Sequence, residues 1–135
     1  MNAIDTNVLV YAFNKAYPQK RKICNEIITN IFEGKQKGAI TNQILAEFAN
    51  AVTQKIENPI SKEQALAIIQ TILNSSHWKV INYTGETVAK AISTQQPFWG
   101  ALITQTLHEN NVQNIITENT KDFKNSRLTI QNPLA

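Results

Sequence analysis

Cysteine and long apolar runs are scarce in this 135-residue chain, and each scarcity argues against a class of protein. Cys24 is the single cysteine, so the chain cannot form an internal disulfide. No segment approaches the roughly 18 consecutive apolar residues of a membrane-spanning helix. Met1-Asn2-Ala3 also lacks the positive start and apolar core of a secretory signal. We therefore expect neither a disulfide scaffold nor a membrane protein, and a reducing, cytoplasmic setting.

The composition is that of an ordinary globular domain, with 42% apolar and 17% charged residues. A chain of this length fits one compact core, and no repeat or linker divides it, so we expect a single domain over residues 1–135. The net charge is +3, and six of the thirteen basic residues fall within the first forty positions. This excess is compatible with a polyanionic partner such as RNA, although a mild excess of lysine more often serves solubility.

Short apolar runs alternate with amphipathic stretches along the chain, which favours parallel strands joined by helices. The predicted strands cover residues 2–5, 38–41, 79–82, 114–117 and 127–131. The predicted helices cover residues 6–14, 18–34, 42 to the Asn58-Pro59 break, 61–74, 84–94 and 97–110. Thr41 or Asn42 can cap the third of these helices, and Ser61–Gln64 forms a capping box for the fourth. This order predicts a three-layer α/β/α domain with a mostly parallel central sheet, and such sheets bind ligands where their strands end.

Aspartate is rare here, since Asp5 and Asp122 are the only two in the chain. Asp5 ends the first apolar run and comes directly before a segment with helical spacing. It is therefore the expected anchor of any metal or acid-base site at the strand ends. The simpler alternative is that Asp5 only caps the following helix, because aspartate is a favoured N-cap residue.

Four blocks of sequence carry a family resemblance. They are Ile4–Tyr11 (Ile-Asp-Thr-Asn-Val-Leu-Val-Tyr), Gln43–Phe48 (Gln-Ile-Leu-Ala-Glu-Phe), Pro97–Ile103 (Pro-Phe-Trp-Gly-Ala-Leu-Ile) and Ile116–Phe123 (Ile-Thr-Glu-Asn-Thr-Lys-Asp-Phe). In this order they resemble the signature blocks of PIN-domain proteins. The resemblance spans nearly the whole chain, whose size matches the single-domain toxins of the VapC type. Each block alone is a weak signal, whereas four in the family's order are a strong one.

The resemblance implies a metal-dependent endoribonuclease of a toxin-antitoxin type, inhibited by a small antitoxin protein and often forming homodimers. Asp5 and Glu47 would be the catalytic acids and ligands of Mg²⁺ or Mn²⁺, with Thr6 and Asn7 making supporting polar contacts. Hard divalent cations prefer carboxylate oxygens and water, so acids at these positions suit such an ion. A surface role is the plain alternative for Glu47.

The fourth block matches the family variant that reads Thr-x-Asn-x-x-Asp-Phe. By this resemblance Asn119 would be a neutral metal ligand through its side-chain oxygen, and Asp122 would be a supporting acid near the site. Glu118 flanks Asn119 and is a second acid that could reach the crevice. A capping or surface role is the alternative for Asp122.

The third block departs from the family at one position, because Gly100 stands where the family has an acid. Glu109, nine residues on, would point to the opposite face of a helix, and Thr104 would share the face of Gly100 but supplies only a hydroxyl. We therefore expect weak activity or none. Helix propensity does not explain a glycine there. One hypothesis is a disarming substitution, which a glycine codon in the native gene would contradict.

Two other classes of function stay open beside the ribonuclease. A catalytically inactive PIN module would bind RNA or a protein partner without cleaving it. Aspartate at position 100 should raise the activity of a weakened enzyme, whereas Asp5→Asn should leave a pure binding module's affinity unchanged. A flavodoxin-like regulatory domain is disfavoured, because no acidic pair adjoins Asp5 and no glycine-rich loop follows the first strand.

The remaining chemically distinctive residues have structural interpretations. Phe98 and Trp99 are predicted to be core or dimer-contact residues, because they are not interleaved with basic residues as in a base-stacking surface. His77 and His108 lack the spacing of a zinc site and are predicted to lie on the surface. Cys24 is predicted to be a buried thiol on an isoleucine-rich helix.

Overall fold

A computed structural model describes residues 1–135 and contains one five-stranded sheet. The strands are β1 (Asn2–Ile4), β2 (Gly38–Thr41), β3 (Trp78–Ile81), β4 (Asn114–Ile116) and β5 (Thr129–Gln131). They lie in the order β3-β2-β1-β4-β5, and every neighbouring pair is parallel. The expected parallel sheet is confirmed, and β1 lies at its centre.

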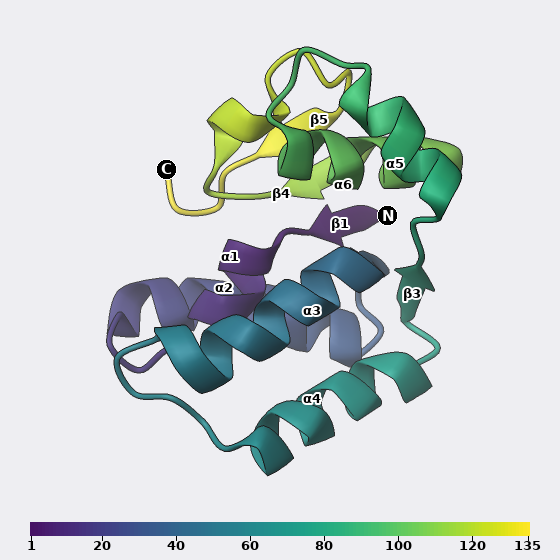
Figure 1. Cartoon of the computed structure of the whole chain (residues 1–135). Helices are drawn as coiled ribbons and strands as arrows, with labels where there is room; N and C mark the ends of the chain where they lie inside the picture. Colours follow the sequence, from purple (N-terminus) through teal and green to yellow (C-terminus); the bar gives the residue numbers. More distant parts are fainter.

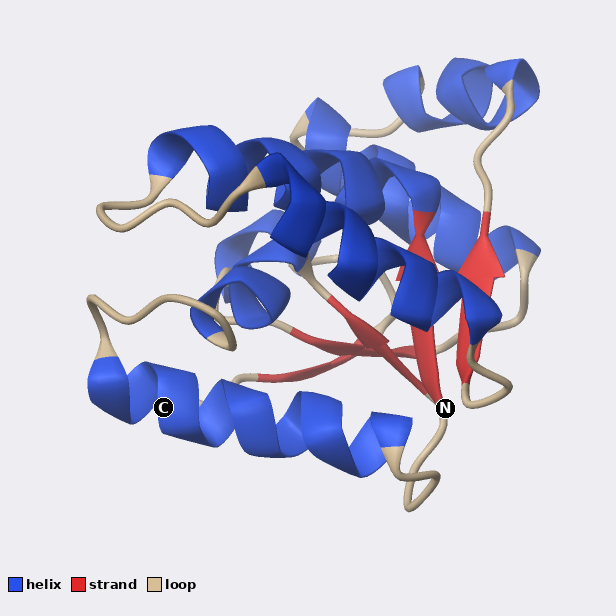
Figure 2. Cartoon of the chain, turned by 90° about the horizontal axis from the view of Figure 1, so that it is seen from below, coloured by secondary structure: helices blue, strands red, loops and turns tan.

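Helices connect these strands and cover the sheet. They are α1 (Thr6–Tyr11), α2 (Pro18–Phe32), α3 (Asn42–Asn50), α4 (Lys62–Asn74), α5 (Gly85–Ile92) and α6 (Phe98–Glu109). In Figure 1, α1 to α4 lie below the central strand β1, while α5, α6, β4 and β5 lie above it. Figure 2 shows the strands in the interior with helices on both sides. The predicted three-layer α/β/α, PIN-like class is therefore confirmed. None of the helices has the length and apolarity needed to cross a bilayer.

Most predicted elements are present, with ends that differ by a few residues. The last strand is shorter than predicted, because Arg127 adopts a left-handed backbone conformation with φ of 66°, which a strand cannot accommodate. The predicted helix from residue 42 to the Asn58-Pro59 break ends in a π-helical turn, η1 (Ala51–Lys55), and a 3₁₀ turn that was not predicted, η2 (Thr120–Phe123), follows β4. The second of these carries Asp122 to the strand ends.

Side-chain caps explain why several helices begin where they do. Thr41 ends β2, and its Oγ1 accepts a hydrogen bond from the amide of Ile44 at 3.1 Å, so α3 starts directly at the strand end. Ser61 and Gln64 form the predicted capping box at the start of α4. Asp5 is the N-cap of α1, where its side chain accepts a hydrogen bond from the amide of the next residue, Thr6. Two helices that carry predicted site residues thus leave adjacent strands at the same edge of the sheet.

The core is built around the two central strands. Ala3 and Ile4 of β1 and Ala39 and Ile40 of β2 are fully buried, as expected for parallel strands covered on both faces. Cys24 is also fully buried, and burial raises the pKa of its thiol to about 11. The prediction of an inert structural thiol is consistent with this environment, because the reactive species is the thiolate.

Phe48 tests how far the α3 side of the core depends on one side chain. It is fully buried, and its ring lies edge-on to Phe13 with centroids 5.8 Å apart. Phe48→Ala should lower the free energy of unfolding by about 3–5 kcal/mol, measured by urea denaturation. Leu66→Ala is the control, since Leu66 is 53% exposed on α4 and should change stability by about 0.5 kcal/mol or less. Similar losses in both variants would contradict this description of the core.

Candidate metal and acid-base site

Asp5 follows the last residue of β1 and is almost completely buried, with 6% of its surface exposed. Three donors hold its carboxylate. The amide of Thr6 donates to Oδ1 at 2.8 Å, and the Thr117 hydroxyl and the Asn7 side-chain amide donate to Oδ2 at 2.7 and 3.2 Å. Asp5 is therefore both the N-cap of α1 and the centre of a polar network. The role of helix cap, predicted as the alternative to a site residue, does not exclude a role in a site.

Thr117 ties the end of β4 to the end of β1. Its hydroxyl donates to Asp5 and accepts hydrogen bonds from the amide of Asn119 at 2.9 Å and from the Asn7 side chain at 3.3 Å. The Oδ1 atom of Asn7 accepts from the amide of Glu118 at 3.1 Å. The predicted supporting role of Asn7 thus has a structural basis: it fixes the loop after β4 against the start of α1.

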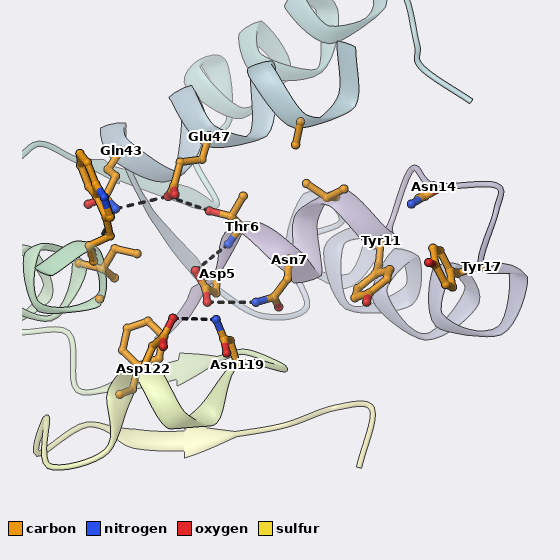
Figure 3. A pocket seen from close by; sticks show the side chains of 16 residues that line it. Asp5, Thr6, Asn7, Tyr11, Asn14, Tyr17, Gln43, Glu47, Asn119 and Asp122 are labelled. Carbon is orange, nitrogen blue, oxygen red and sulfur yellow. Dashed lines mark hydrogen bonds between the residues drawn. The ribbon is translucent and has the colours of Figure 1, made fainter. Parts of the chain in front are cut away.

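Glu47 approaches the same place from α3. Its Oε1 accepts hydrogen bonds from the Thr6 hydroxyl at 3.1 Å and from the side-chain amide of Gln43 at 3.4 Å. Thr6 therefore joins Asp5 through its amide and Glu47 through its hydroxyl. Figure 3 shows Asp5 between Glu47 on one side and Asp122 with Asn119 on the other.

The 3₁₀ turn η2 brings the third carboxylate. Asp122 Oδ2 accepts a hydrogen bond from the side-chain amide of Asn119 at 2.7 Å. This bond occupies the nitrogen of Asn119 and leaves the side-chain oxygen available to another ligand. Asn119 and Asp122 thus lie together at the site, as the fourth sequence block predicts, but they are paired with one another rather than with Asp5.

These side chains line a pocket of about 420 Å³ at the strand ends. Its wall includes three carboxylates, those of Asp5, Glu47 and Asp122, and contains no lysine, arginine or histidine. Most of the other lining residues are polar or aromatic: Thr6, Asn7, Asn14, Gln43, Asn119, Tyr11, Tyr17, Trp99 and Phe123. Val10, Ala51, Gly100 and Ile103 complete the wall. The pocket therefore concentrates negative charge with no cation in its own wall, and the charge of Lys55 outside it lowers the pKa of Glu47 only in part.

Burial is the main perturbation of the two acids closest to β1, and the neighbouring negative charges add to it. Burial raises the pKa of Asp5, and the negative charge of Asp122 adds to that rise, although the bonds from Thr117, Thr6 and Asn7 partly offset it. Burial also raises the pKa of Glu47, and the charge of Asp5 raises it further. Both carboxylates are therefore less stable as anions here than in water, and a bound cation would relieve that cost.

Gly100 lies where α6 meets η2, and its lack of a side chain has a steric cause. A Cβ atom at this position would lie 2.8 Å from the backbone oxygen of Asp122 and 3.2 Å from its Cβ. A Cβ atom does not normally approach a non-bonded backbone oxygen to 2.8 Å, so a larger residue at position 100 would have to displace η2. The turn that carries Asp122 and Asn119 thus occupies the space that a side chain on α6 would need. This contact supplies the reason for glycine that helix propensity does not.

Other acids predicted as alternatives lie outside the pocket. Glu118 turns away and binds the Tyr11 hydroxyl at 2.9 Å and Lys20 at 3.0 Å, and the bond from Lys20 lowers its pKa. Glu109 binds Thr87 and Gln105, which confirms that it points away from Gly100. The site therefore has no further carboxylate beyond the three named.

Three predictions about neighbouring residues need correction or addition. Trp99 is 63% exposed at the edge of the pocket, so it does not take the core position that was one of its two predicted roles, and a dimer contact stays a prediction, while Phe98 is partly buried against a small cluster. Thr104 does not share the pocket of Gly100 and lines a separate one. Gln43 was not predicted as a site residue, although its position four residues before Glu47 on one helix face could have indicated it.

The donor set suits a hard divalent cation, although it is sparse. No group of three or more His, Cys, Asp or Glu side chains in the chain is arranged to hold a metal ion. Carboxylate and amide oxygens nevertheless surround the pocket, and the side-chain oxygen of Gln43 is buried with no hydrogen-bond partner. An oxygen ligand without a partner beside repelling carboxylates fits a cation that retains several waters, as Mg²⁺ does.

The contact between Gly100 and η2 predicts the effect of adding one methyl group. Gly100→Ala should lower the free energy of unfolding by about 1–3 kcal/mol, because η2 must move. Gly85→Ala is the matched control: a Cβ there meets nothing within 4 Å, so its stability should be unchanged or higher. Chemical denaturation of both variants checks this. Equal behaviour would show that η2 does not constrain position 100.

The raised pKa of Glu47 predicts a pH-dependent effect of removing its charge. Since the folded state holds this proton to higher pH than the unfolded state, ionisation costs stability as pH rises above the ordinary value of 4.5. Glu47→Gln keeps an oxygen for Thr6 and Gln43 and should stabilise the chain by about 0.2–0.5 kcal/mol at neutral pH, since Glu47 is partly exposed. Thermal unfolding measured without divalent ions should show this gain vanishing below pH 4.5. A gain that persists in acid would contradict the electrostatic explanation.

Comparison with known proteins finds likeness in structure alone. No protein-family model and no curated protein matches this sequence. A chain of a toxin-antitoxin complex from Klebsiella pneumoniae matches with a TM-score of 0.64 at 18% identity, covering 98% of both chains. A chain of VapBC2 from Rickettsia felis, solved bound to a promoter DNA fragment, matches with a TM-score of 0.62 at 21% identity, covering 97% of both.

A chain of FitAcB from Neisseria gonorrhoeae gives a similar result, with a TM-score of 0.63 at 15% identity over 98% of both chains. These identities are low, so the likeness concerns the fold. Each match nevertheless spans almost the full length of both chains. The chain therefore has the PIN-like fold found in VapBC and FitAB toxin-antitoxin complexes, as its four sequence blocks predict.

Proposed function

We propose that this chain is a metal-dependent endoribonuclease of the toxin-antitoxin type. The observation that carries the proposal is the pocket of three carboxylates, with no basic side chain, at the ends of parallel strands. The structural likeness to toxin-antitoxin complexes supports the same assignment. RNA is the proposed substrate, Mg²⁺ or Mn²⁺ the cofactor and the cytoplasm the place of action.

Asp5 and Glu47 are the proposed principal ligands, with Asn119 as a neutral one. When bound, the ion would polarise the phosphodiester, lower the pKa of a water molecule and offset the charge that develops during cleavage. Asp5 is held in place by three donors, so its carboxylate keeps its position without rearrangement. Thr6 is hydrogen-bonded to both Asp5 and Glu47 and thereby fixes the position of one carboxylate relative to the other.

Asp122 is the proposed third acid, in place of one on α6. Its turn packs directly on Gly100, so this chain supplies from η2 a carboxylate that a longer residue at position 100 would otherwise provide. Three formal charges rather than four imply a weaker hold on Mg²⁺, with substrate phosphates and water completing the coordination. We therefore propose a ribonuclease of low activity.

The second candidate is a non-catalytic module that binds RNA or a protein. It is favoured by the absence of any group of three or more His, Cys, Asp or Glu side chains arranged around one metal position. In either case a small antitoxin protein is a proposed partner, because the structural matches come from toxin-antitoxin complexes. A homodimer is also proposed, and Trp99, at 63% exposure, is available for such a contact.

Cleavage of a mixed-sequence RNA in Mn²⁺ or Mg²⁺ tests the two candidates directly. The parent chain should cleave slowly, and Asp5→Asn should reduce the rate by about 100-fold or more, because removing an electrostatic group of a preorganised site has that effect. Glu26→Gln, an exposed position on α2, is the control for loss of one carboxylate. RNA that stays intact with the parent chain would favour the binding module.

Metal binding provides a second measurement that does not depend on activity. Mn²⁺ should raise the Tm of the parent chain by mass action and raise that of Asp5→Asn or Glu47→Gln less. Gly100→Asp should not restore a fast enzyme, because its side chain must displace η2 and so disturb Asp122. A large rise in rate for Gly100→Asp would overturn the assignment of Asp122 as the third acid.

A further inference from the structure

A second pocket, of about 520 Å³, lies beside the acidic one and has the opposite charge. It is bounded by the turn before α6, by α6 itself and by the loop after η2. Lys121, Lys124 and Arg127 line it, together with mostly neutral polar side chains, and no aspartate or glutamate does. We refer to it as the basic pocket.

The basic pocket and the acidic pocket share two walls. On α6, Gly100 faces the acidic pocket while Ala101 and Thr104 face the basic one. On η2, Asp122 faces the acidic pocket while its neighbour Lys121 faces the basic one. The two pockets therefore adjoin each other, separated by α6 and η2. An extended polyanion could contact both at once.

Two buried groups in the wall of the basic pocket have no hydrogen-bond partner. They are the hydroxyl of Thr104, a residue 5% exposed, and the side-chain nitrogen of Gln96. The contrast with Thr106 on the same helix is informative, since its hydroxyl donates to the Leu102 carbonyl at 2.7 Å. Buried polar groups are nearly always paired, but both atoms are covered here, so a ligand that accepts hydrogen bonds would reach them only after a small movement of the pocket wall.

The basic side chains of this pocket are also unpaired. The ion pairs of the chain involve Lys20, Lys35 and Lys90, none of which lies in the pocket. A ligand oxygen carrying negative charge would therefore meet lysine and arginine nitrogens that have no competing carboxylate. Hydroxyl and amide donors beside unpaired cations are the groups that proteins use to bind a phosphate.

We infer that the basic pocket binds a phosphodiester of the RNA strand whose neighbouring linkage lies in the acidic pocket. The inference rests on the proposed ribonuclease function, which places the scissile linkage beside Asp5 and Glu47. Phosphate is favoured over the carboxylates of an acidic protein segment because the basic pocket adjoins the acidic one, where the proposed function places an RNA linkage. Lys121, Lys124 and Arg127 supply charge, and Thr104 and Gln96 supply hydrogen bonds.

Thr104→Val tests the hydrogen-bonding part of the inference. The substitution keeps the shape and removes the unpaired hydroxyl, so the Tm should stay the same or rise, while affinity for a fluorescent single-stranded RNA falls about 3- to 10-fold. Thr106→Val is the matched control, and it should leave RNA affinity unchanged. Binding is measured by anisotropy in EDTA, which prevents cleavage. Unchanged RNA affinity in Thr104→Val would overturn the role of its hydroxyl.

A charge series tests the electrostatic part. The triple variant Lys121→Gln, Lys124→Gln, Arg127→Gln should bind this RNA at least 10-fold more weakly, and the slope of log K against log salt should shrink by about 2. The control triple Arg21→Gln, Lys62→Gln, Lys79→Gln removes the same charge from exposed positions elsewhere. Equal losses in the two triples would overturn the basic pocket as a specific site.

Parallel measurements separate this inference from the proposed function. Pocket-dependent RNA binding without cleavage in Mn²⁺ would support the basic pocket and overturn the nuclease. Cleavage by the parent chain with binding independent of Lys121, Lys124 and Arg127 would do the reverse. Poly-glutamate is the probe for an acidic protein segment. Pocket-dependent binding of poly-glutamate in place of RNA would overturn the phosphodiester assignment.

Discussion

The buried carboxylate of Asp5 is the interaction on which the arrangement of this molecule depends. It lies where the central strand ends, it starts α1 as a cap, and it receives the Thr117 hydroxyl from the neighbouring strand end. A carboxylate with 6% exposure needs these donors, because an unpaired buried charge is very costly. The same contacts therefore stabilise the joins between strands and helices and hold a charged group ready for a ligand.

Charge is distributed in a way that a folding argument alone does not explain. Three carboxylates gather in one pocket without a cation, and three cations gather in the next without a carboxylate. Pairing these groups with one another would satisfy both sets, yet α6 and η2 keep them apart. Ionised Asp5 and Glu47 lower the stability of the fold, because burial and neighbouring negative charge raise their pKa values. Strain of this kind is common where a site awaits a ligand of the opposite charge.

Gly100 shows how one position links the fold to this arrangement. Its backbone lies so close to Asp122 that no side chain fits between α6 and η2. Taken from the sequence, the glycine indicates only the loss of an acid. In the structure it permits the approach of another acid, since η2 brings Asp122 and Asn119 to the pocket. The number of carboxylates in this pocket therefore depends on how closely η2 packs on Gly100.

The sequence predicted the elements whose signals are local. Apolar runs indicated the five strands, Thr41 and the Ser61 capping box indicated helix starts, and Asp5 was identified at a strand end. Glu47 could be placed on α3 by helical spacing and its role by family resemblance. The sequence patterns did not predict elements whose geometry depends on contacts between distant segments or on a left-handed backbone conformation. The left-handed Arg127 shortened the last strand, and η2 has no periodic pattern.

What the sequence determined by itself is the order of elements, the parallel sheet and the place of Asp5 at the end of its first strand, because hydrophobic periodicity and capping act between residues close in the chain. Tertiary structure decided the rest. It turned Glu118 toward Lys20, brought Asp122 into the acidic pocket, exposed Trp99 and left Thr104 unpaired beside three basic side chains. These outcomes depend on which distant segments pack together, and no spacing along one segment encodes that.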